Sequence, residues 1–221
     1  MKKDGIKKVL LGILGAILII GSIVLLTDSV PYLFNNSAKD VDELIANGEY
    51  LSDYENKYVS VYVDFALDKY ARTDHKRYAI TTGSDYHYGI LLGDDSIISV
   101  DVSSKKENAM DKIVDDTWDY LDYKRDNLTN DPIVLKGKLK KLGSSLYSYY
   151  EELLNDLGID KNEYQIHYYT IDSTTSPLSE TLISIGVLVI GTFMLVSVIK
   201  DFTNRKEKEV NMTSDGGQDG Y

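Results

Sequence analysis

Two apolar stretches decide the architecture: residues 9–26 read VLLGILGAILIIGSIVLL, and residues 182–199 read LISIGVLVIGTFMLVSVI. Neither stretch contains a charged residue. At ~1.5 Å rise per residue, a helix of this length spans about 27 Å, close to the hydrocarbon thickness of a bilayer. A soluble core helix would carry charges on its outward face at every turn. The sequence therefore predicts two transmembrane helices, at residues 9–26 and 178–199.

The first stretch has a second interpretation, as the core of a cleaved secretory signal. Four lysines precede it, as they would in a signal sequence (Lys2, Lys3, Lys7 and Lys8). However, no pair of small residues follows at cleavage spacing, and the apolar run is longer than a usual signal core. We therefore expect an uncleaved anchor.

The basic residues around the helices predict the orientation in the membrane. Four precede the first helix, four follow the second, and none lies in residues 28–37 or 162–199. Positive flanks remain on the cytoplasmic side, so we expect a protein that crosses the cell membrane twice with both termini cytoplasmic. Residues 1–8 are then the cytoplasmic N-terminus, residues 28–177 an extracytoplasmic domain, and residues 200–221 a cytoplasmic tail. The polar, glycine-rich composition of this tail predicts disorder.

Composition excludes several classes of function. The 221 residues carry a net charge of −11, whereas a nucleic-acid binder needs a basic surface. Cysteine is absent, which rules out disulfides, thiolate metal sites and a cysteine nucleophile. We expect no nucleic-acid partner; the expected partners are the membrane and another membrane or envelope protein.

The segment between the helices alternates between strand and helix periods. Residues 59–68 alternate with period two, and further strands are predicted at 78–82, 86–92, 97–102, 133–139 and 164–171, with Gly83–Ser84–Asp85 as a turn. Helical spacing predicts helices at 41–47, 104–121 and 146–157. This order predicts an α+β domain. It is either a small mixed sheet with helices on one face or an OB-like barrel, that is, a partly open barrel of five strands.

The whole layout resembles a known group of proteins. The features are MKK before an apolar helix, DVDELIANGEY at 40–50, IISVDV at 97–102, PIVLKGKLKKL at 132–142 and a C-terminal apolar helix. Together they resemble uncharacterised two-pass membrane proteins of Gram-positive bacteria, over most of the chain. The resemblance implies the membrane topology and carries no activity, cofactor or site residue.

Signatures of catalysis are weak in this sequence. Asp85 and His87 would share one side of a strand, where they could hold a metal or act as an acid–base pair. No metal-ligand spacing, nucleophile motif or phosphate-binding loop accompanies them. The acids of the helix at 104–121, including Asp115 and Asp116, are expected to form a solvated face. We therefore expect no catalytic residue, metal or cofactor.

Two groups of side chains are candidates for binding. Tyrosine is unusually frequent, with 18 residues against four phenylalanines, and tyrosine is enriched at binding surfaces. The candidate partner face consists of Tyr147, Tyr149, Tyr150, Tyr168 and Tyr169; the alternative is that a small sheet uses tyrosine in place of phenylalanine. The second group is Lys136, Lys138 and Lys140, a basic strand face for an anionic ligand or, alternatively, a lysine-guarded edge strand.

The sequence favours a non-enzymatic, membrane-anchored interaction module on the outside of the cell. The double anchor, the acidic tyrosine-rich domain and the missing catalytic motifs support this interpretation. Two alternatives remain open: an envelope hydrolase or metal-dependent enzyme that uses Asp85 and His87, and a transmembrane ligand sensor.

Overall fold

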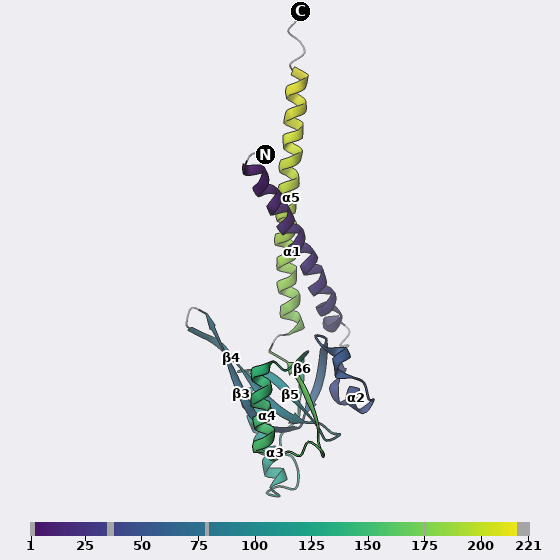
Figure 1. Cartoon of the computed structure of the whole chain (residues 1–221), viewed down its shortest axis with the longest axis vertical. Helices are drawn as coiled ribbons and strands as arrows, with labels where there is room; N and C mark the ends of the chain where they lie inside the picture. The colour runs from purple at the N-terminus through teal and green to yellow at the C-terminus, as the bar shows by residue number, and fades with distance from the viewer. Residues whose placement is uncertain (1–2, 35–37, 78–79, 175, 216–221) are drawn as a thin grey trace, which may run out of the picture. The chain divides into compact units, whose positions relative to one another are not determined.

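The computed structural model describes residues 3–34, 38–77, 80–174 and 176–215 (Figure 1). The chain forms two compact units: a pair of helices made by its two ends, and an α+β domain between them. α1 spans Lys3–Phe34 and α5 spans Pro177–Asp215. The stretches Ile6–Thr27 and Pro177–Asn204 are long and apolar enough to cross a membrane. α5 continues into the tail for which composition predicts disorder; residues 216–221 of that tail lie outside the described residues.

α1 and α5 approach each other closely at a point where both present glycine. A Cβ on Gly15 would lie 2.9 Å from the backbone oxygen of Gly191, and a Cβ on Gly191 would lie 2.9 Å from that of Gly15. In addition, the Thr181 hydroxyl donates to Ser29 Oγ at 3.0 Å. Close backbone approach and interhelical hydrogen bonds are what hold helices together in lipid. The two predicted helices thus form one packed unit.

The domain is built on a mixed sheet that has seven strands within the described residues. The strands are β1 (Lys39–Asp40), β2 (Tyr58–Val63), β3 (Phe65–Arg77), β4 (Ile80–Leu91), β5 (Ser96–Ser103), β6 (Ile133–Lys141) and β7 (Gln165–Asp172). Their order is β1-β2-β6-β7-β5-β4-β3; β1–β2 and β5–β7 are parallel and the other pairs antiparallel. The predicted α+β class with a mixed sheet is confirmed. β1 and β3 form the edges, and the OB-like alternative is not confirmed.

Helices cover both faces of this sheet, so the expectation of helices on one face is wrong. α2 (Val41–Ala46), the 3₁₀ helix η1 (Leu51–Tyr54) and α3 (Glu107–Leu121) pack on one face, over a core that includes Val61, Val100 and Leu135. α4 (Ser144–Asp156) packs on the other face through Tyr150 and Leu154. We call these the α3 face and the α4 face. Successive residues of a strand point to opposite faces, which is why both β5 and β7 contribute to both cores.

Two strand boundaries differ from those predicted. The strand at 59–68 breaks at Asp64, because β2 pairs with β6 near one edge whereas β3 pairs with β4 at the other edge. The Gly83–Ser84–Asp85 turn is also wrong, since these residues lie within β4, opposite His75, Asp74 and Thr73 of β3. The strands expected at 78–82 and 86–92 therefore form one long strand; residues 78 and 79 lie outside the described residues. Alternation identifies a strand, but pairing partners decide where it bends.

The register of the sheet places the start of β1 and the end of β7 in neighbouring rows, a row being a set of residues that lie opposite one another on adjacent strands. Lys39 of β1 lies opposite Val59, and Val59 lies opposite Gly137; the next residue, Lys138, lies opposite Asp172 at the end of β7. The chain therefore enters and leaves the sheet in neighbouring rows. We call the opposite end of β5 and β7, where both strands begin, the far end of the sheet.

Candidate functional site

Beyond the apolar cluster under α4, the α4 face becomes polar. At the centre of this region His87 of β4 lies directly opposite Asp101 of β5, and both are buried. The distance between His87 Nδ1 and Asp101 Oδ1 is 2.6 Å, and that between His87 Nε2 and Thr73 Oγ1 is 2.8 Å. When the imidazole is neutral it donates to the carboxylate from Nδ1 and accepts the Thr73 hydroxyl at Nε2.

Further hydroxyl groups extend this network across the sheet. Thr170 of β7 donates to Asp101 Oδ1 at 2.8 Å, and Ser99 donates to Thr170 at 3.2 Å. The backbone N–H and the hydroxyl of Ser173 both donate to the backbone oxygen of Asp101, at 2.9 and 2.8 Å. The network therefore connects the edge strand β3 to the point where β7 ends and the chain continues toward α5.

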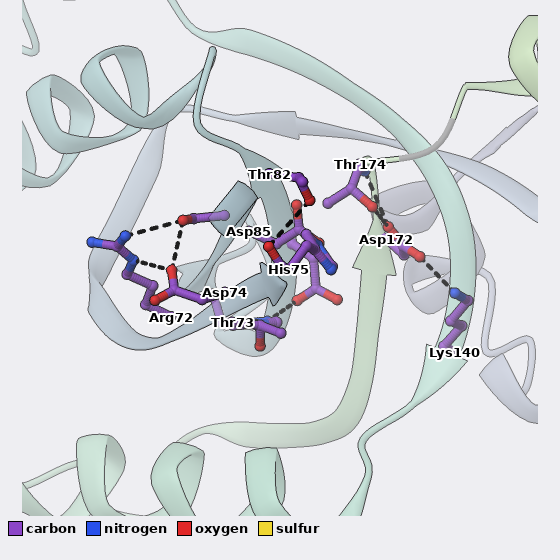
Figure 2. A network of polar contacts seen from close by, with 12 residues as sticks. Arg72, Thr73, Asp74, His75, Thr82, Asp85, Lys140, Asp172 and Thr174 are labelled. Carbon is purple, nitrogen blue, oxygen red and sulfur yellow. Dashed lines mark hydrogen bonds and ion pairs between the residues drawn. The ribbon is translucent and has the colours of Figure 1, made fainter. Parts of the chain in front are cut away.

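The order hydroxyl, imidazole, carboxylate is the one that activates a hydroxyl nucleophile in hydrolases. It is made by Thr73, His87 and Asp101, residues whose sequence spacing carries no recognised motif. The pair predicted from sequence is not formed, because Asp85 instead bonds His75 Nε2 at 2.5 Å (Figure 2). Within the described residues, no group of three or more histidines and carboxylates is arranged to hold a metal ion.

The five candidate tyrosines do not form one surface. Tyr150 of α4 is fully buried against the sheet, and Tyr168 packs on Tyr147 with ring centroids 4.9 Å apart. Tyr169, the next residue of β7, points to the α3 face and packs against the core there. Only Tyr147 and Tyr149 are exposed, so at Tyr150 and Tyr169 the alternative, tyrosine as a core residue, describes the packing.

The three candidate lysines lie together on the α4 face of β6. Lys140 pairs with Asp172 at 2.5 Å (Figure 2). Lys138 Nζ lies 5.2 Å from the ring centroid of Tyr58. Lys136 belongs to the same face and is exposed. The edge-strand interpretation is wrong, because β6 lies inside the sheet between β2 and β7. Binding of an anionic ligand by these lysines stays a prediction.

Sequence reasoning missed the role of Asp116, which was expected on a solvated face. Its side chain is 3% exposed. Oδ1 accepts from Arg125 Nη1 at 2.8 Å and the Thr129 hydroxyl at 2.6 Å, and Oδ2 accepts from the backbone N–H groups of Thr129 and Asn130 at 2.6 and 3.0 Å. These hydrogen bonds, those from Thr129 first, lower the pKa of Asp116 to about 2. A signal was available: position 116 follows the apolar Ile113 by three residues, on the inward side of α3.

The loop that Asp116 holds presents an aromatic surface at the far end of the sheet. We call Tyr120, Leu121, Tyr123 and Arg125 the Tyr123 patch; together with Asp126 they line a cavity of about 290 Å³. Tyr123 is 96% exposed and has a φ of 56°. This left-handed conformation is uncommon for a bulky residue and persists only where the surroundings fix it. Here the backbone N–H groups of Lys124 and Arg125 both bond the Asp119 carbonyl.

Comparison with protein families adds one finding. Residues 1–201 match the family described as a domain of unknown function, DUF8577. The chain belongs to the DUF8577 family. The match extends over α1, the whole α+β domain and the apolar part of α5, so both terminal helices are part of the DUF8577 family region. No curated protein matches the chain.

For this DUF8577 protein, the arguments about function therefore rest on its own side chains. The α4 face carries a hydroxyl–imidazole–carboxylate network in which His87 and Asp101 are buried, and the far end carries exposed tyrosines at the end of α3 and on the loop that follows it. The first arrangement is able to move a proton, and the second is able to bind a surface.

Proposed function

We propose that this DUF8577 protein is a membrane-anchored interaction protein whose α+β domain binds another envelope protein outside the cell. The basic residues that flank both apolar helices support an orientation with both termini in the cytoplasm. Entry and exit of the chain in neighbouring rows of the sheet is compatible with two helices that return to the same membrane. Two anchors confine the domain to a thin layer, which raises its effective concentration for membrane-bound partners.

The observation that carries the proposal is the Tyr123 patch. Within the described part of the domain, eight large apolar or aromatic side chains are exposed, and six of them are tyrosines. Tyrosine offers a large ring at low conformational-entropy cost, together with a hydroxyl for hydrogen bonding. Tyr123 combines almost complete exposure with a fixed backbone, which reduces the entropy lost when a partner binds.

The chemistry of the partner follows from the patch and its surroundings. Tyr120 and Leu121 supply apolar area. The Arg125 guanidinium already pairs with Asp116 and Asp119, at 2.8 and 3.1 Å, and leaves 44% of its side chain exposed at the edge of the patch. Such a surface suits a protein partner with an apolar centre and a polar rim. The acidic composition disfavours a nucleic acid.

Cross-linking and co-purification of the full chain from native membranes test this proposal. We expect a partner that is recovered with the wild-type protein and lost with the double variant Tyr120→Ala, Tyr123→Ala. The matched control is Tyr147→Ala, Tyr149→Ala, which removes two exposed tyrosines of α4. If the partner is lost with the control variant and retained with the patch variant, the interface lies on α4 instead. If no partner is recovered with the wild-type protein, the proposal is refuted.

The topology has its own test. Reporter fusions at residue 100 and at the C-terminus should report opposite sides of the membrane. Fusions that both report the same side would exclude an extracytoplasmic domain with cytoplasmic termini.

One observation favours a second candidate, an envelope hydrolase with Thr73 as nucleophile. His87 Nε2 lies 2.8 Å from Thr73 Oγ1, with Asp101 behind it. An active-site fluorophosphonate probe should then label the wild-type protein and not the Thr73→Ala variant. The exposed Thr82→Ala variant is the control, and equal absence of labelling in all three proteins would dismiss this candidate.

A further inference from the structure

A second cavity opens on the α3 face of the sheet, at the far end. It has a volume of about 410 Å³ and lies between β7 and the segment that follows α2. Gln165, His167 and Tyr169 alternate along β7 and line one wall, while Tyr50 and Ser52 line the other. Small-molecule sites have volumes of about 300–1,000 Å³, so the cavity suits a ligand at the small end of that range.

The walls of this cavity hold several hydrogen-bonding groups that the described residues do not use. His167 Nε2 is buried and has no partner there. The side chains of Tyr50, Ser52, Gln165 and Tyr169 also make no hydrogen bond within the described part of the chain. Since buried polar groups in folded proteins are nearly always paired, the orphaned His167 Nε2 indicates a ligand, and the exposed side chains of Tyr50, Ser52 and Gln165 offer that ligand further donors and acceptors.

The charges around the cavity limit the chemistry of that ligand. Glu49 is the charged residue of the described wall, and its carboxylate already binds Lys39 at 3.3 Å and the Tyr54 hydroxyl. Burial lowers the pKa of His167, so this imidazole is neutral at pH 7. The wall therefore offers neither a free cation for a phosphate nor an unpaired carboxylate for an amine. A neutral ligand fits best.

The aromatic side chain at the mouth adds a shape requirement. Tyr50 is 77% exposed, so one face of its ring is open to a ligand. A pyranose ring combines an apolar C–H face, which packs on an aromatic ring, with hydroxyl groups at its edge that both donate and accept. The amide of Gln165 and the imidazole of His167 can each donate one hydrogen bond and accept another.

We propose that this cavity binds a neutral saccharide of one or two pyranose rings, stacked on Tyr50 and hydrogen-bonded to Gln165 and His167. The proposal does not rest on the protein partner of the Tyr123 patch. The two sites share no lining residue, and their variants differ.

The test uses the full chain in phosphatidylcholine nanodiscs, because glycoside detergents would present their own sugar rings. Saturation-transfer NMR and titration with N,N′-diacetylchitobiose, cellobiose and maltose should reveal binding of at least one disaccharide. Loss of the stacking ring in Tyr50→Ala should weaken that binding about tenfold. Gln165→Ala should weaken it several-fold.

Tyr62→Ala is the matched control, since Tyr62 is 51% exposed on β2 and does not line the cavity. Its binding should equal that of the wild-type protein, and unchanged thermal unfolding of Tyr50→Ala would show that this variant is folded. Adenosine, titrated in the same way, is the comparison ligand. The proposal would be overturned if none of the three disaccharides shows saturation transfer at about 10 mM, a concentration that detects even a millimolar Kd. It would also be overturned if Tyr50→Ala leaves saccharide binding unchanged, or if adenosine binds and no saccharide does.

Discussion

Removal of the Asp116 carboxylate should destabilise the domain and release the loop that presents Tyr123. The carboxylate accepts four hydrogen bonds, from Arg125, Thr129 and Asn130. A hydrogen bond to a charged group contributes about 1.5–3 kcal/mol. Arg125, Thr129 and Asn130 are exposed and regain water in the variant, so the total loss is smaller than four such contributions. We expect Asp116→Asn to lower the free energy of unfolding by about 2 kcal/mol at pH 7.

The lowered pKa of Asp116, which the same hydrogen bonds cause, leads to a similar magnitude. Its pKa falls from the ordinary value of 3.8 to about 2 on folding, which corresponds to about 2 kcal/mol. Because the pKa is lowered, the stabilisation is fully present above about pH 4 and is lost as the pH falls toward 2. The difference between wild type and Asp116→Asn should therefore shrink over this range and be small at pH 2.

Urea unfolding followed by tryptophan fluorescence measures this difference. Trp118 is the single tryptophan, and its indole N–H donates to the Leu67 carbonyl at 2.7 Å, so its emission reports on the contact between α3 and β3. Asp115→Asn, an exposed neighbour, is the control and should change stability by less than about 0.5 kcal/mol. A difference for Asp116→Asn below that limit at pH 7, or one that stays constant down to pH 2, would refute the reasoning.

Three other substitutions test the remaining contacts. Asp101→Asn removes the charge that His87 Nδ1 and Thr170 bond, and should cost about 2–3 kcal/mol in urea unfolding; unchanged stability would mean that the network contributes little. Gly191→Leu places side-chain atoms against the Gly15 carbonyl, which a Cβ meets at 2.9 Å, and should lower the disulfide yield between cysteines introduced at positions 12 and 198; an equal yield would contradict the glycine contact. Gly137→Ala places a Cβ in overlap with the Asp172 carbonyl, so β6 and β7 must separate and Tm should fall by several degrees, whereas Gly143→Ala, whose Cβ meets nothing within 4 Å, should leave Tm unchanged.

Much of the fold could be predicted because it depends on local patterns. The apolar helices need only length and hydrophobicity, and α3 and α4 follow from residues at helical spacing, such as Met110 and Ile113 in α3. Strand order could not be predicted, since β6 inserts between β2 and β7 through pairings far apart in the chain. The same limit explains the split at Asp64 and the missed continuity of β4 through Gly83.

The features of the candidate sites also divide into those that the sequence determined and those that only the tertiary structure decided. Sequence alone determined that tyrosine is the unusual residue of this protein, that imidazole is scarce and that two apolar segments enclose an acidic domain. Only the tertiary structure decided that His87 pairs with Asp101 rather than Asp85, that Tyr150 is core while Tyr123 is exposed, and that Gln165 and His167 border a cavity with Tyr50. Composition and periodicity depend on each residue and its near neighbours, whereas a site depends on which strands pair and which faces are covered, and those are properties of the whole folded chain.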